Sequence, residues 1–103
     1  MEVTKKLTGD ELIVELKGEV DESGLSALRP RIDESFFTTG ARRVVVDLSG
    51  VSFMDSTGIG MLLGRYKALK LKGVPIFLRS PTPVVDKLLN LSGIYEIMPR
   101  INR

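Results

Sequence analysis

The chain has 103 residues, of which 43% are hydrophobic and 27% are charged, a composition typical of one soluble globular domain with a single core. It contains no cysteine and no histidine, so disulfide bonds, thiolate metal sites and histidine general bases are excluded. No apolar run is long enough to cross a bilayer, and residues 1–6 are too polar to open a signal peptide. We therefore expect a cytoplasmic protein with no membrane contact.

The net charge of +2 conceals an uneven distribution along the chain. Residues 1–36 carry 9 acidic and 5 basic side chains, whereas residues 37–103 carry 4 acidic and 10 basic ones. The basic side chains are scattered from Arg42 to Arg103, and no aromatic residues interleave with them as a nucleic-acid stacking platform requires. We expect no direct binding of nucleic acid.

The first third of the sequence predicts a hairpin followed by a helix. Residues 3–7 and 11–17 have the alternation of strands, and Thr8-Gly9-Asp10 between them suits a hairpin turn. Apolar residues recur at helical spacing over residues 21–37, but Pro30 interrupts this run. We expect a helix that is kinked, or that begins late, at Pro30.

The middle of the sequence predicts a strand, a helix and a second strand. Residues 43–48 are apolar without alternation, which is typical of a central strand covered on both faces. From Thr57 to about Lys72 the apolar period changes to that of a helix, and Gly73 ends it. Residues 76–78 form another apolar strand.

The last part of the sequence predicts a helix and a final strand. Thr82 and Pro83 are a helix cap and a proline at the first helical position, and they open a helix over residues 84–91. Residues 94–98 predict a short final strand. The order β-β-α-β-α-β-α-β indicates an α/β fold: a mixed sheet with an N-terminal hairpin, then alternating helices and strands, in one domain over residues 1–103.

The run Phe53-Met54-Asp55-Ser56-Thr57-Gly58-Ile59-Gly60 joins the central strand to the second helix and leaves a hydroxyl at the junction. The first N–H groups of a helix have no partner within it, so a phosphate on Ser56 would be stabilised there. Serine at such a junction is more often a cap that accepts from an N–H group two or three residues on. If Asp55 takes that capping role, Ser56 is free to face solvent.

Two glycines, Gly60 and Gly64, lie one turn apart on the predicted second helix, with Met61 beside them. Each costs about 1 kcal/mol relative to alanine in a helix interior, which suggests a packing or contact requirement. Two interpretations are open: this side packs against a neighbouring helix of the same domain, or it is a docking surface for another protein beside Ser56. The glycine spacing fits neither the dinucleotide fingerprint nor the phosphate loop, so no nucleotide cofactor is expected.

The run from Phe53 to Gly60, continued by Leu63-Gly64-Arg65-Tyr66-Lys67, closely resembles the signature of bacterial anti-sigma factor antagonists of the STAS-domain family, particularly the sporulation type. Gly18-Glu19-Val20-Asp21 and Leu91-Ser92-Gly93-Ile94 also resemble segments of that family at compatible spacing. The likeness extends over nearly the whole chain.

The resemblance implies a partner-switching protein that is not an enzyme and needs no metal or cofactor. In such a family the unmodified protein binds an anti-sigma factor, itself a serine kinase, and so frees a sigma factor. Phosphorylation releases the kinase, and a metal-dependent serine phosphatase restores the active form. Carried over to this chain, Ser56 is the phospho-acceptor. The candidate partner-binding residues are Asp21, Asp55, Ser56, Thr57, Gly58, Gly60, Met61 and Gly64.

Other interpretations stay open beside this one. The chain could be a non-enzymatic STAS subunit or scaffold of a larger stress-signalling or transport complex, in which Ser56 is never phosphorylated. A small module that responds to a nucleotide or metabolite has poorer support in the sequence. Thr57 is a candidate secondary acceptor, which its position beside Ser56 does not exclude.

Overall fold

Strands and helices alternate along the part of the chain that the computed structural model describes, which is residues 1–102 without the side chain of Arg29. Arg103, the last of the scattered bases, lies outside the described residues. The strands are β1 (Glu2–Thr8), β2 (Glu11–Val20), β3 (Arg43–Met54), β4 (Ile76–Arg79) and β5 (Arg100–Ile101). The helices are α1 (Glu22–Ser35), α2 (Ser56–Lys70) and α3 (Pro83–Ser92), and a short 3₁₀ helix, η1 (Ile94–Glu96), precedes β5.

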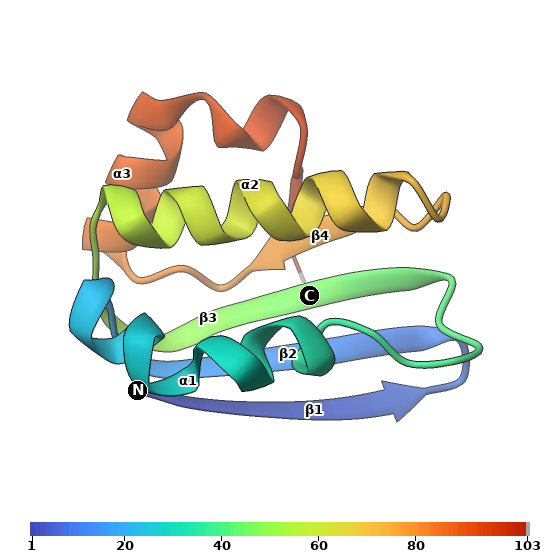
Figure 1. The fold of residues 1–103 in the computed structure, drawn as a ribbon. Coiled ribbons are helices and arrows are strands. Elements are labelled where there is room, and N and C mark those ends of the chain that lie inside the picture. Colours follow the sequence, from blue (N-terminus) through green and yellow to red (C-terminus); the bar gives the residue numbers. More distant parts are fainter. Residues whose placement is uncertain (103) are drawn as a thin grey trace.

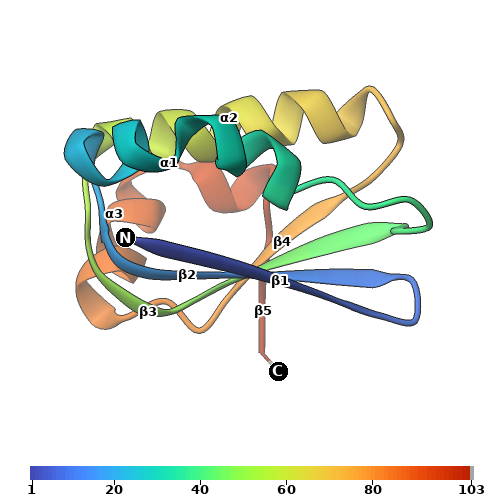
Figure 2. The ribbon, with the colours of Figure 1, turned by 60° about the horizontal axis from the view of Figure 1, so that its bottom comes forward.

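The strands form one mixed sheet in the order β1-β2-β3-β4-β5. The hairpin strands β1 and β2 are antiparallel, whereas the pairs β2–β3, β3–β4 and β4–β5 are parallel. Helices α1 and α2 lie side by side over the sheet (Figures 1 and 2). The α/β fold and the element order predicted from the sequence are confirmed. Because β2 and β3 are parallel, their carboxyl ends meet at one edge of the sheet, where α1 and α2 begin.

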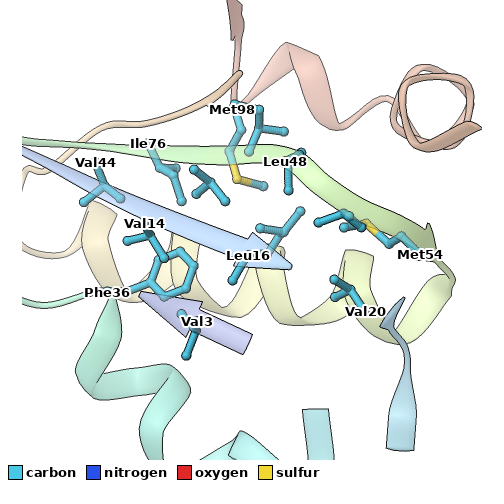
Figure 3. Packing of buried hydrophobic residues seen from close by; sticks show 14 of the residues in the cluster. Val3, Val14, Leu16, Val20, Phe36, Val44, Leu48, Met54, Ile76 and Met98 are labelled. Carbon is cyan, nitrogen blue, oxygen red and sulfur yellow. The ribbon is translucent and has the colours of Figure 1, made fainter. Parts of the chain in front are cut away.

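The core lies between the sheet and the helices that cover it. Figure 3 shows Val14, Leu16, Val44 and Leu48, which come from neighbouring strands, gathered around this interior with Phe36. The helices contribute buried side chains to the same cluster: Leu25, Ile32, Leu62, Leu69, Val85 and Leu89.

The apolar run in β3 is buried on both sides of the strand. Val44, Val45 and Val46 all have 0% exposure, as the lack of alternation predicts. Since successive residues of a strand point to opposite faces, Val45 points away from the main core. It is flanked there by Ile13 of β2 and Phe77 of β4, its partners in the strand register.

Strand β3 is longer than the sequence predicts, because it continues past Leu48 to Met54. The polar residues Ser49 and Gly50 look like the end of a strand. In the structure the pairing with β2 shifts register between Glu15 and Lys17, and then continues to the pair Val20–Met54. The extension carries the chain to the edge of the sheet where α2 starts.

Helix α1 begins at Glu22 and passes through Pro30, so the predicted late start is wrong. The side chain of Asp21 accepts a hydrogen bond of 2.9 Å from the N–H of Gly24, which caps the helix. Leu25 and Ile32 are buried on either side of the proline. Proline cannot donate the backbone hydrogen bond that a helix requires at this position. Burial of the apolar face compensates for that loss and keeps the helix continuous.

The predicted strand over residues 94–98 is also wrong. Gly93 has a left-handed φ of 75° that ends α3, and η1 follows directly. The N–H of Met98 donates to the carbonyl of Ile94 at 2.9 Å, and both side chains are buried by this helical turn. Short apolar runs do not distinguish a strand from a helical turn by period, and the final strand is β5.

Candidate functional site

Helix α2 is capped by Asp55 and not by Ser56. The side chain of Asp55 accepts a hydrogen bond of 2.9 Å from the N–H of Thr57, and its backbone is extended, as at an N-cap. Ser56 is therefore the first residue of the helix, and it is exposed. Of the two arrangements that the sequence leaves open, the structure has the one in which Asp55 caps α2 and Ser56 faces solvent.

The other predicted acidic residue, Asp21, lies at the same edge of the sheet. The β2–β3 register pairs Val20 with Met54, so the residues that follow them, Asp21 and Asp55, begin neighbouring helices from neighbouring strands. Each of the two aspartates caps its own helix. Parallel pairing thus brings Asp21 to the junction that carries Ser56, although the two are far apart in the sequence.

Gly58 is a buried residue that positions the start of α2. A Cβ atom at this position would lie 2.6 Å from Cγ of Met54 and 2.8 Å from the carbonyl oxygen of Val20. These distances are shorter than van der Waals contact, so only glycine lets the first turn of α2 approach the ends of β2 and β3 this closely. The sequence groups Gly58 with the partner-binding candidates, but the structure places it inside the protein.

The glycines further along α2 have a different environment. A Cβ atom at Gly60 or Gly64 would meet no atom within 4 Å. Gly60 is exposed and Gly64 half-buried, while Leu71, just beyond the helix, has 91% exposure. The interpretation that a neighbouring helix of the same domain requires these glycines is therefore wrong. Their side of α2 is open, whereas Thr57 and Met61 are half-buried at its border.

Two apolar side chains near the junction are exposed, which the sequence pattern does not predict. Phe53, near the end of β3, has 43% exposure, and Val84, in the first turn of α3, has 65%. The Thr82 hydroxyl donates a hydrogen bond of 3.2 Å to the carbonyl of Val51, which holds the start of α3 beside this end of β3. In both ribbon views α3 lies next to the start of α2 (Figures 1 and 2). The apolar pattern of β3 does not indicate that the Phe53 side chain is exposed.

Comparisons with known proteins agree with this geometry. Residues 2–103 match the STAS domain family. An anti-sigma F factor antagonist of Paenibacillus polymyxa is 39% identical over 88 residues, which cover 85% of this chain and 75% of that protein. Within residues 1–102, no helix has both the length and the apolar character needed to cross a membrane.

Two solved structures have the same arrangement of elements. The anti-sigma factor antagonist SpoIIAA in its unphosphorylated form has a TM-score of 0.79 and 25% sequence identity, and the match covers 99% of this chain and 88% of that one. The Bacillus cell fate determinant SpoIIAA in the phosphorylated form has a TM-score of 0.69 and 25% identity, with 99% and 91% of the two chains covered. The fold and the junction sequence agree with the family match over residues 2–103. The chain therefore belongs to the STAS-domain family.

Proposed function

We propose that this protein is an anti-sigma factor antagonist that binds an anti-sigma factor in its unmodified form and loses that binding when Ser56 is phosphorylated. The observation that carries the proposal is the capping of α2 by Asp55, because it leaves the Ser56 hydroxyl exposed and free of a structural role. The antagonist identity of the relatives supports the same function.

The partner in this proposal docks on the junction and on the open side of α2. The absence of side chains at Gly60 and Gly64 lets another protein's backbone or side chains approach the helix closely. Phe53 and Val84 offer exposed apolar area near the end of β3 and at the start of α3, and burial of such area drives association. Asp21 and Asp55 border this surface as carboxylates that already cap helices.

Phosphorylation of Ser56 would oppose this docking by charge and desolvation. A phosphate adds about −1.5 to −2 charge at neutral pH, and here it would be placed beside Asp55 at the border of a partly apolar surface. The first turn of α2 accommodates the same group within the protein, because its N–H groups and dipole favour an anion. The switch therefore acts on the interface more than on the fold, and each 1.4 kcal/mol of lost interaction weakens binding by about tenfold.

The partners follow from this assignment. The protein works by binding and not by catalysis, in the cytoplasm, where it meets an anti-sigma factor that is a serine kinase. A metal-dependent serine phosphatase returns the phosphorylated form to the binding state. In the alternative function, a STAS subunit or scaffold of a larger complex, Ser56 has no regulatory role.

The experiment uses four baits in parallel pull-downs from lysate of the source organism: the wild type, Ser56→Asp, Ser56→Ala and Thr39→Leu. Thr39 is an exposed residue of the loop at the opposite end of the sheet and serves as the matched control. We expect an ATPase-fold serine kinase with wild type, Ser56→Ala and Thr39→Leu, and its loss with Ser56→Asp. Equal recovery of the same proteins by wild type and Ser56→Asp would contradict the switch and favour the scaffold.

A further inference from the structure

A groove lies between α1 and α2, with a cavity volume of about 250 Å³. Its apolar lining comes from Leu25 and Ile32 of α1 and Met61 of α2, and its charged lining is the ion pair of Asp33 with Arg65. Ligand sites are commonly about 300–1,000 Å³, so a groove of this size suits only a small organic molecule.

Arg65 is a half-buried cation whose Nε–H group is an unused hydrogen-bond donor within residues 1–102. Its side chain has 20% exposure, and its Nε is the buried side-chain polar atom for which the described part of the chain provides no hydrogen-bond partner. A guanidinium carries five N–H donors in a planar fork, and Asp33 engages Nη1. Burial lowers the pKa of Arg65, because the charged guanidinium is partly removed from water.

Asp33 is a weakly held partner of that cation. Its side chain has 66% exposure, so it can leave Arg65 and be hydrated at little cost. A carboxylate from a ligand would arrive with an apolar tail that the groove can bury, and would bind the same fork of donors. The Asp33 carboxylate thus occupies part of the position on Arg65 that the carboxylate of a bound acid would take.

We propose that the groove between α1 and α2 binds a small aliphatic monocarboxylate, with its carboxylate on Arg65 in place of Asp33 and its tail between Leu25, Ile32 and Met61. Charge complementarity to Arg65 and the size of the groove select this class of ligand. The proposal stands independently of Ser56 and of the proposed function.

The test is an NMR titration of the protein with 4-methylpentanoate, followed at the methyl groups of Leu25, Ile32 and Met61. The neutral amide of the same acid is the matched ligand control. Arg65→Gln removes the cation, Asp33→Asn removes the competing carboxylate, and Arg100→Gln removes an arginine from another ion pair, with Asp86.

We expect saturable shifts of the three sets of methyl signals with the acid, in the millimolar range, and none with the amide. Binding should weaken by about tenfold or more in Arg65→Gln, strengthen by about threefold in Asp33→Asn, and stay unchanged in Arg100→Gln. Because Asp33→Asn changes only an exposed side chain, it keeps the test decisive if Arg65→Gln does not fold. Equal shifts with acid and amide, or no saturable binding to either the wild type or Asp33→Asn, would overturn the proposal.

Discussion

Gly58 and Gly60 are two positions apart in α2 and have opposite surroundings. Gly58 is pressed against the ends of β2 and β3, whereas the Cβ position of Gly60 is open. The sequence shows both as glycines of one motif, and only the structure separates a residue that positions the helix from one that leaves its surface free. The distinction depends on distances to other elements, which no local pattern contains.

The two glycines therefore predict opposite effects of the same substitution. Gly58→Ala should destabilise the protein by roughly 1–3 kcal/mol, because the new methyl group would overlap Met54 and Val20. Gly60→Ala should stabilise it by about 0.5–1 kcal/mol, because alanine is the better helix former and meets no neighbour. Urea unfolding of both variants measures this, and equal losses of stability would contradict the packing described.

The cap of α2 gives a second prediction at the scale of single residues. Asp55→Ala should cost about 1 kcal/mol of stability, because the N–H of Thr57 loses its acceptor. Ser56→Ala should change the free energy of unfolding by less than about 0.5 kcal/mol, as an exposed residue outside the cap. Thermal unfolding of the two variants compares them directly. A larger loss of stability in Ser56→Ala than in Asp55→Ala would show that Ser56, and not Asp55, caps α2.

Asp47 gives a prediction about pH. Burial alone would raise the pKa of Asp47, but hydrogen bonds from the hydroxyl and N–H groups of Ser49 and from Arg79 outweigh it and lower that pKa below its ordinary value. A carboxyl group whose pKa is lowered by folding contributes stability above its unfolded pKa and loses it as the pH falls through its folded pKa.

The wild type should accordingly exceed Asp47→Asn in stability near about pH 7, and the difference should shrink toward about pH 3. Urea unfolding at several pH values gives both free energies, with Glu96→Gln as a control for an exposed carboxylate. A difference between wild type and Asp47→Asn that does not change with pH would be inconsistent with a stabilising ionised Asp47.

Among the elements, α2 is one whose two ends the sequence predicts to within about two residues. Its apolar period predicts the length of the helix, and Gly73 predicts its end. In the structure the N–H groups of Gly73 and Val74 donate to the carbonyls of Lys70 and Leu69, and the helix ends there. Residues 94–98 show the limit of the same reasoning. Five mostly apolar residues fit a strand or a helical turn equally well, and tertiary burial of Ile94 and Met98 decides between them.

The open side of α2 predicts that bulk there disturbs binding without disturbing the fold. Gly64→Leu should leave the melting temperature within a few degrees of wild type, because the added side chain meets no atom within 4 Å of its Cβ. It should weaken binding of the anti-sigma factor by about tenfold or more, since it fills the space that a partner would occupy. Isothermal titration calorimetry measures the affinity, with Thr39→Leu as the control; unchanged affinity in Gly64→Leu would place the docking surface elsewhere.

At the scale of the whole molecule, the parallel pairing of β2 with β3 assembles the candidate site. It brings the start of α1, with Asp21, beside the start of α2, with Asp55 and Ser56. The sequence predicts the start of α2 but not that of α1, and the resemblance groups the residues of both starts. Strand neighbours are long-range contacts that the periodicity of a single sequence does not encode. The exposed Phe53 and Val84 could not be predicted for the same reason, because their surroundings depend on how α3 meets the end of β3.

The central claim is that a phosphate on Ser56 abolishes binding of an anti-sigma factor without unfolding the protein. The measurement that tests it most directly is the affinity of the unmodified protein and of protein carrying phosphoserine at position 56 for the anti-sigma factor kinase of the same organism, measured by calorimetry alongside the melting temperature of each form. We expect the phosphorylated form to bind at least about a hundredfold more weakly, which is about 2.7 kcal/mol, at a similar melting temperature. Equal affinity of the two forms would contradict the account.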